Sequence, residues 1–347
     1  MIIRDVDRYN KNIEIAFNNN KYLEKLKNKS IMITGINGLI GSCIVDILNW
    51  LNINESYNIK IIGTVRDKSK TLERFKQYIN LSIIEQDVIE EINYRGTVDY
   101  IIHVASNSHP LSFSSDPVGT MLGNFIGINN VLRFAETHNC RRVEYISSGE
   151  IYGQGEKNLK AFEENYIGRL IPTEFRSCYP ISKLASETLC VSYSKQYNLE
   201  TVIARPCHCY GPTQTESDSR ASAQFIKSVL NEENIVMKSE GKQIRSYCYV
   251  VDCAIAILCI LINGSNKNAY NIANNKSIVS IKKMAEIIAN QANKKVIMAL
   301  PDNKEKEGYN PVTKSVLDDK KLKQLGWVPC WDFNSGIEET LKIMKGK

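Results

Sequence analysis

Short apolar runs alternate with longer amphipathic segments through the first part of the chain. Runs of strand length fall at residues 59–65, 81–84, 98–106 and 142–148, and helical patterns fall at 43–51 and 117–138. Strands that alternate with helices at this spacing are typical of a parallel, doubly wound sheet. The pattern therefore predicts an α/β fold.

The pattern is less regular toward both ends of the chain. Residues 1–28 are polar and partly helical, and we expect them to form an extension without chemistry. Residues 29–205, with part of the later chain, are expected to form the sheet domain, and residues 206–347 mainly a smaller α/β domain. Within the latter, helical patterns lie at residues 221–230, 252–262, 280–291 and 336–344.

A glycine-rich turn separates the first apolar run from the first helix. Residues 29–41 read K-S-I-M-I-T-G-I-N-G-L-I-G, which places Gly35, Gly38 and Gly41 at GxxGxxG spacing. Glycines let such a turn close tightly and let backbone N–H groups approach a pyrophosphate at the helix N-terminus. A strand before the turn and a helix after it indicate a dinucleotide-binding domain of the Rossmann type.

The end of the second predicted strand bears on the choice of cofactor. Arg66 occupies the position that usually meets the adenosine ribose, and Asp67 and Lys68 come directly after it. A guanidinium pairs with the 2′-phosphate of NADP, whereas a carboxylate accepts from the 2′-hydroxyl of NAD. The register therefore favours NADP(H). NAD(H) stays possible if these residues form only a charged loop.

Composition narrows the class of protein. The chain has 347 residues, 43% of them hydrophobic, and a formal net charge of +6. That charge suits an acidic small molecule and is too small and dispersed for nucleic acid. No apolar run approaches about 20 residues and no apolar signal core opens the chain, so a cytoplasmic protein is expected, without a membrane partner.

The ten cysteines contain no CxxC pair. The tripeptide Cys207-His208-Cys209 lies in a strand-like run, where alternate side chains point to opposite faces of the sheet. Such side chains do not converge on one ion, so no metal site is predicted. Reduced, structural thiols are the expectation for a cytoplasmic chain.

Residues 178–190 place Tyr179 and Lys183 four positions apart at the start of a helical pattern. Both side chains would share one helix face, where an ammonium stabilises a phenolate and draws the tyrosine pKa toward neutrality. The fifth predicted strand ends in S-S-G-E-I-Y-G, which brings Ser148 and Glu150 to the carboxyl edge of the sheet. This arrangement predicts a proton-transfer site beside the dinucleotide.

Several short motifs occur here in one order. They are T-G-x-x-G-x-x-G (34–41), D-V (87–88), H-V-A-S (103–106), N-x-x-G (124–127), S-S-x-x-x-Y-G (147–153), Y-x-x-x-K (179–183), A-R-P-x-x-x-Y-G-P (204–212) and L-G-W-x-P (325–329). Together they resemble the extended short-chain dehydrogenases/reductases that modify nucleotide sugars, the NAD-dependent epimerase/dehydratase family. The resemblance covers about residues 29–345.

The resemblance implies a role for each matching position. Tyr179 would be the catalytic acid or base, Lys183 would hold the nicotinamide ribose, and Ser148 would bind the reacting sugar oxygen. Arg245 would bind the substrate diphosphate, while His208 replaces the usual Asn and leaves phosphate contacts there in doubt. The cofactor would meet Gly35, Asn37, Gly38, Leu39, Ile40, Gly41, Arg66, Asp87, Val88, Val104, Ala105, Ser106, Tyr179, Lys183 and Pro206.

The resemblance also implies partners and a type of reaction. The smaller domain would close over a nucleotide-diphosphate sugar, and the Tyr-bearing helix and its predecessor would form a homodimer interface. Hydride would move between the nicotinamide and a sugar carbon, usually C4. After this shared step, the reactions of the family members diverge.

Arg66 and Glu150 favour different reactions. Arg66 suggests NADPH and a net reduction, in which a dTDP- or CDP-linked 4-keto-6-deoxyhexose gives the 4-hydroxy sugar for surface polysaccharide (O-antigen or capsule) biosynthesis. Glu150 suggests instead a 4,6-dehydratase or a UDP-glucuronate decarboxylase with an internally recycled cofactor, and a 4-epimerase also stays open. Gly149 stands where many dehydratases have the Asp that expels water. A nucleotide-sugar or NADP(H) sensor is the non-enzymatic alternative, although a sensor has no need of Ser148, Tyr179 and Lys183 together.

Overall fold

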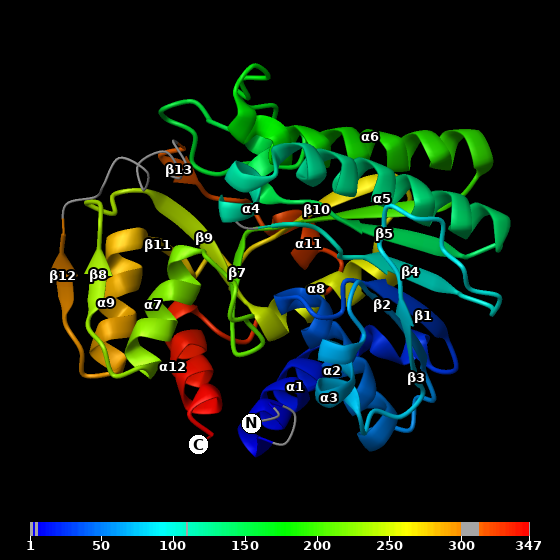
Figure 1. Cartoon of the computed structure of the whole chain (residues 1–347), viewed down its shortest axis with the longest axis horizontal. Helices are drawn as coiled ribbons and strands as arrows, with labels where there is room; N and C mark the ends of the chain where they lie inside the picture. Colours follow the sequence, from blue (N-terminus) through cyan, green and yellow to red (C-terminus); the bar gives the residue numbers. More distant parts are fainter. Residues whose placement is uncertain (1–2, 4–5, 109, 300–311, 347) are drawn as a thin grey trace.

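A seven-stranded parallel sheet forms the centre of the molecule (Figure 1). The computed structural model describes residues 3, 6–108, 110–299 and 312–346. Every neighbouring pair in the order β10-β6-β5-β4-β1-β2-β3 is parallel, which confirms the predicted α/β, Rossmann-type class. The strands are β1 (Ser30–Thr34), β2 (Lys60–Val65), β3 (Leu81–Glu85), β4 (Tyr100–His103), β5 (Arg142–Ile146), β6 (Glu200–Pro206) and β10 (Asn268–Ile272).

Helices cover both faces of this sheet, because alternate residues of each strand point in opposite directions. In β1, Ile31 and Ile33 join the core beneath α2 (Leu39–Asn54) and α8 (Val250–Asn263), and Met32 joins the core on the other face. That second face is covered by α5 (Pro117–Thr137) and α6 (Cys178–Tyr197), which run side by side in Figure 1. Two short helices, α3 (Ser69–Phe75) and α4 (Pro110–Ser115), come after β2 and β4.

A smaller unit lies beside the carboxyl edge of the sheet. One of its sheets contains β7 (His208–Tyr210), β9 (Ile244–Tyr249), β11 (Ile278–Ser280) and β13 (Lys314–Ser315), and the other pairs β8 (Ile235–Met237) with β12 (Val296–Met298). Its helices are α7 (Ala221–Leu230), α9 (Ile281–Gln291) and α12 (Phe333–Met344). The short helix α11 (Lys320–Lys323) lies against β10 of the large sheet, where Lys321 donates to Asn268 and Ala269. The helical patterns predicted at 221–230, 280–291 and 336–344 coincide with α7, α9 and α12, and the fourth, 252–262, lies within α8 of the large sheet.

The N-terminal segment is packed against both parts of the molecule. It forms α1 (Asp7–Asn19) and the 3-10 helix η2 (Lys21–Leu26). The Tyr9 hydroxyl donates to Asp46 of α2 at 2.8 Å, and Asn12 donates to Glu339 of α12 at 2.9 Å. Tyr249 of β9 donates to Asn12 at 3.0 Å. The apolar face of α1 lies in the main core, with Tyr9, Ile13, Ala16 and Phe17 buried.

All ten cysteines are free thiols. Cys207 is half-buried and Cys209 is buried. Within residues 3, 6–108, 110–299 and 312–346, no group of three or more His, Cys, Asp or Glu side chains is arranged to hold a metal ion. In the same part of the chain, no helix combines the length and the apolarity needed to cross a membrane.

Candidate active site

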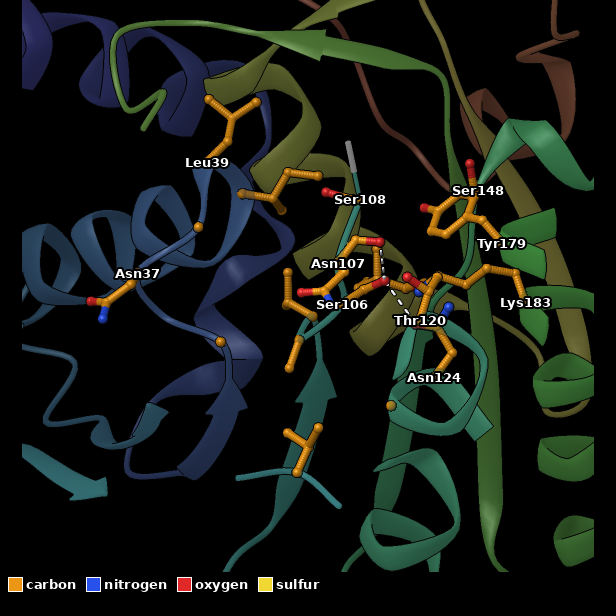
Figure 2. A pocket seen from close by; sticks show the side chains of 18 of the residues that line it. Asn37, Leu39, Ser106, Asn107, Ser108, Thr120, Asn124, Ser148, Tyr179 and Lys183 are labelled. Carbon is orange, nitrogen blue, oxygen red and sulfur yellow. Dashed lines mark hydrogen bonds between the residues drawn. The ribbon is translucent and has the colours of Figure 1, made fainter. Parts of the chain in front are cut away.

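A cavity of about 770 Å³ opens at the carboxyl ends of β1, β2, β4 and β5, where the large sheet faces the smaller unit. Figure 2 shows side chains of several elements pointing into it. The predicted site residues that line the cavity are Gly35, Asn37, Gly38, Leu39, Ile40, Arg66, Asp87, Val88, Val104, Ala105, Ser106, Ser148, Glu150, Tyr179, Lys183, Pro206 and His208. Two others, Gly41 and Arg245, do not line it.

Two of the three glycines in the turn, Gly35 and Gly41, are required by close contacts with the backbone. Gly35 has φ +72°, and a Cβ there would lie 2.8 Å from the Ala105 Cα. A Cβ on Gly41 would lie 2.5 Å from the Gly35 carbonyl oxygen, so this glycine lets α2 approach the turn. A Cβ on Gly38 would meet nothing closer than 3.5 Å among the described residues. The open backbone at Gly38 and the N–H groups in the first turn of α2 fit the pyrophosphate of a dinucleotide.

The segment after β2 places one positively and one negatively charged side chain at the cavity. Arg66 and Asp67 line it together, and Asp87 and Val88 line it from the end of β3. The Asp67 carboxylate accepts from the Ser69 backbone N–H at 3.0 Å. An adenosine ribose at this edge would therefore meet a guanidinium next to a carboxylate that is already hydrogen-bonded.

Tyr179 and Lys183 lie on one face of α6 as predicted, and both are buried. The Lys183 Nζ donates to the Ile146 carbonyl at 2.8 Å and lies 5.8 Å from the centre of the Tyr179 ring. Burial lowers the pKa of Lys183 to about 7. An amine that is poorly charged at neutral pH is a weak stabiliser of a phenolate.

The predicted lowering of the tyrosine pKa by Lys183 is wrong for this structure. Burial raises the pKa of Tyr179 well above its ordinary value, and the Glu150 carboxylate raises it further. Hydrogen bonding to Ser148 and the charges of Arg220 and Arg176 act in the opposite direction. The sequence shows the spacing of the pair but not the removal of water around it.

A chain of hydrogen bonds joins the helix of Tyr179 to the end of β4. Ser106 donates to Asn124 of α5 at 2.7 Å (Figure 2), and Asn124 donates to Ser182 of α6 at 2.9 Å. Ser182 donates to the Tyr179 carbonyl at 2.9 Å. These contacts hold the first turn of α6 against the cavity wall.

Two arginines that the sequence analysis did not single out lie at the site. Arg176, in the 3-10 helix η4 (Phe175–Ser177), forms an ion pair with Glu150, which lies in the 3-10 helix η3 (Gly149–Tyr152), at 3.1 Å. Arg220 lines the cavity and binds both carboxylate oxygens of Asp218. The sequence carries one signal for Arg220, its place at the end of the polar loop after Pro212.

Arg245 and His208 belong to paired strands of the smaller unit. The Arg245 guanidinium is buried and donates to the backbone carbonyls of Ile244 and Val312. Burial and the charges of Arg245 and Arg220 lower the pKa of His208 to about 3, so this imidazole is neutral. Of the two residues, His208 lines the cavity and Arg245 does not. Binding of the substrate diphosphate by Arg245 stays a prediction.

Residues 31–273 match the family model described as "NAD dependent epimerase/dehydratase family". This range spans the large sheet from β1 to β10. The chain is 30% identical over 335 residues to UDP-glucuronic acid decarboxylase 6 of Arabidopsis thaliana, a match that covers 94% of this chain and 92% of that protein.

Solved structures show the same fold. The UDP-glucose 4-epimerase of Thermotoga maritima, crystallised with UDP-glucose, aligns with a TM-score of 0.79 at 23% identity and covers 91% of this chain and 98% of its own. The dTDP-glucose 4,6-dehydratase of Bacillus anthracis, crystallised with NAD, aligns with a TM-score of 0.75 at 20% identity, covering 91% and 96%.

Proposed function

We propose, from the premise that the chain belongs to the NAD-dependent epimerase/dehydratase family, that it decarboxylates a nucleotide-linked uronic acid and recycles its cofactor in each turnover. The observation that carries this proposal is the Glu150 carboxylate, which lines the same cavity as Tyr179 and Ser148. A net ketone reduction needs the tyrosine and the serine but no additional carboxylate. Similarity to UDP-glucuronic acid decarboxylase 6 over most of both chains supports the same choice.

The residues of the cavity divide the reaction between them. A bound nicotinamide would supply the hydride acceptor and donor. Tyr179 takes the proton of the sugar C4 hydroxyl while Ser148 donates a hydrogen bond to the C4 oxygen. The resulting ketone is β to the C6 carboxylate, so the C5–C6 bond breaks, CO₂ leaves and the electron pair moves to the C4 oxygen. Glu150 then passes a proton from solvent water to C5, and C4 is reduced again while Tyr179 returns its proton to the C4 oxygen.

The cavity also offers a cation for an acidic sugar. Arg220 lines it, and although burial lowers the pKa of this guanidinium, the hydrogen bond and charge of Asp218 raise it more, so the group stays charged. Arg245 would meet the diphosphate only if side chains at the cavity wall moved, since Arg245 does not line the cavity. We therefore assign the carboxylate of the substrate to Arg220.

The test is to incubate the purified protein with NAD and UDP-glucuronate, together with the same uronic acid on other nucleotides. The expected result is release of CO₂ and formation of the nucleotide pentose with no net change in reduced cofactor. Tyr179→Phe should abolish both. Stoichiometric oxidation of NADPH with a dTDP- or CDP-linked 4-keto-6-deoxyhexose, without decarboxylation, would show that the proposal is wrong.

A 4-ketoreductase is the second candidate, and one observation favours it. Arg66 lines the cavity at the end of β2, where it would meet a 2′-phosphate. If this function holds, Arg66→Ala should raise the KM for NADPH much more than the KM for NADH. Equal changes in the two constants would remove the argument for NADP(H). Tight binding of a nucleotide sugar without turnover, unchanged by Tyr179→Phe, would instead support a sensor.

A homodimer through α5 and α6 is part of the same proposal. Each helix exposes large apolar side chains, among them Met121 and Phe125 of α5 and Leu184 and Val191 of α6. Exposed apolar faces on neighbouring helices suit a second copy of the same pair. Light scattering should give a dimer for the wild type and a monomer for Phe125→Asp combined with Val191→Asp. A monomeric wild type would contradict this.

A further inference from the structure

Arg176 contacts one of the two side chains that move protons in the proposed mechanism. It belongs to η4, three residues before Tyr179. Its Nη2 lies 3.1 Å from one Glu150 carboxylate oxygen and 3.4 Å from the other. The arginine side chain is 17% exposed and the glutamate side chain 23% exposed, so the pair is largely shielded from water.

The same guanidinium also reaches the tyrosine through an aromatic ring. Its central carbon lies 4.5 Å from the centre of the Phe113 ring, which comes from α4. The Phe113 ring stacks on the Tyr179 ring at 4.5 Å with an interplanar angle of 24°. Stacking and cation–π contacts of this geometry restrict the planes of both rings. Arg176 thus contacts Glu150 by charge and Tyr179 through Phe113.

We propose that Arg176 is a positioning residue that fixes the Glu150 carboxylate and, through Phe113, the ring of Tyr179, so that both side chains face the reacting sugar together. The inference rests on the proposed function, in which Glu150 and Tyr179 both move protons. A partly buried ion pair adds little net stability because desolvation offsets the charge attraction. The benefit of this pair is therefore the orientation of the carboxylate.

The charges of Glu150 and Arg176 act on the pKa of Tyr179 in opposite directions, and this effect can be measured. The Glu150 carboxylate raises the pKa of Tyr179 and the Arg176 guanidinium lowers it. Loss of Arg176 removes part of the positive charge that opposes the carboxylate, and Arg220 remains, so the pKa of Tyr179 rises. Since the tyrosine must accept a proton, the ascending limb of the pH–rate profile moves to higher pH. The other titratable or charged groups that face the tyrosine are Arg220, Lys183 and Tyr145.

The experiment compares Arg176→Gln, Arg176→Lys and Phe113→Leu with the wild type. The control is Arg133→Gln, which removes an exposed ion pair of 3.0 Å with Glu91 on the surface of α5. Nicotinamide reduction is followed in a single turnover with UDP-glucuronate across a range of pH. The ionisation of Tyr179 is measured separately, as the difference in ultraviolet absorbance between each variant and the same variant carrying Tyr179→Phe. Thermal unfolding checks that each variant folds.

For Arg176→Gln we expect a single-turnover rate about 10- to 100-fold lower, because small displacements of reacting groups have effects of this size. Its pH limb and its tyrosine titration should both move to higher pH. Arg176→Lys should restore the titration but not the full rate, since an ammonium lacks the planar fork. Phe113→Leu should lower the rate without moving the titration, and Arg133→Gln should match the wild type.

An unchanged tyrosine titration in Arg176→Gln would overturn the inference. If Arg176→Gln does not fold, Arg176→Lys and Phe113→Leu decide it, and wild-type rates in both would overturn it equally. A wild type that releases no CO₂ from UDP-glucuronate refutes the proposed function instead. In that case the absorbance titration still decides the role of Arg176, because it needs no turnover.

Discussion

Two glycines of the turn before α2 should differ in how substitution by alanine affects the stability of the protein. Gly38 and Gly41 are three positions apart. An added Cβ would make only an ordinary contact of 3.5 Å with the Gly35 carbonyl oxygen at Gly38, but would lie 2.5 Å from the same oxygen at Gly41. Gly38 has φ −78° and ψ 168°, which alanine adopts freely. Gly38→Ala should therefore keep the stability of the wild type, whereas Gly41→Ala should lose stability.

The size of each effect is set by these contacts. Overpacking costs about 1–3 kcal/mol, and a Cβ 2.5 Å from a backbone oxygen should cost the upper part of this range, about 2–3 kcal/mol. The better helix propensity of alanine offsets about 1 kcal/mol, so Gly41→Ala should lose about 1–2 kcal/mol of unfolding free energy. Gly38→Ala should stay within about 0.5 kcal/mol of the wild type. A methyl group at Gly38 would, however, keep the pyrophosphate from the N–H groups of α2. Loss of one charge-assisted hydrogen bond weakens binding by about 10- to 100-fold.

Urea unfolding measures the stability of each variant, and calorimetry measures its affinity for NAD. The expected pattern is normal stability with weak binding for Gly38→Ala, and lower stability for Gly41→Ala. Wild-type affinity in Gly38→Ala would refute the assignment of this turn to the pyrophosphate. Wild-type stability in Gly41→Ala would refute the packing argument.

Three further predictions concern single side chains. Glu150→Gln should slow formation of the nucleotide pentose by about 10²- to 10⁴-fold while nicotinamide reduction and CO₂ release continue in the first turnover, as a rapid-quench assay with UDP-glucuronate would measure. Tyr9→Phe removes the hydrogen bond of 2.8 Å to the buried Asp46 and should cost about 1 kcal/mol in urea unfolding, whereas the exposed Tyr197→Phe should cost nothing measurable. The pKa of Lys183 is lowered to about 7 in the folded chain. Between this pH and the ordinary lysine pKa, the unfolded chain therefore binds more protons than the folded chain, and the free energy of unfolding should rise with pH over this range. Lys183→Met should reduce this slope, and equal slopes in wild type and variant would contradict the assignment.

The elements of the large sheet could be predicted because their signals are local. The strand predicted at 59–65 is β2 (Lys60–Val65), and the helix predicted at 117–138 is α5 (Pro117–Thr137). Buried parallel strands are short apolar runs, and each helix between them repeats its apolar face within the segment itself. The glycine turn is equally local, since strand, turn and helix are consecutive.

The rest of the site depends on contacts between distant segments. Phe113 and Arg176 meet Tyr179 and Glu150 only after α4, η3 and η4 have packed together, and no spacing in the sequence records this. The pKa of Tyr179 is likewise set by burial, which is a property of the folded chain. Arg245 is buried and does not line the cavity, and no local pattern in the sequence records this placement.

The N-terminal helix limits how the two parts of the molecule can move. Its hydrogen bonds reach Asp46 beneath the large sheet and Glu339 in the last helix, so α1 and α12 lie together (Figure 1). A hinge motion that separated the smaller unit from the sheet on this side would break these hydrogen bonds and expose the buried apolar face of α1 to water. Entry and exit of a sugar nucleotide must then rely on loops at the mouth of the cavity. Removing residues 1–28 to shorten the protein should consequently loosen the cleft and alter ligand exchange, even though none of the described residues in this segment lines it.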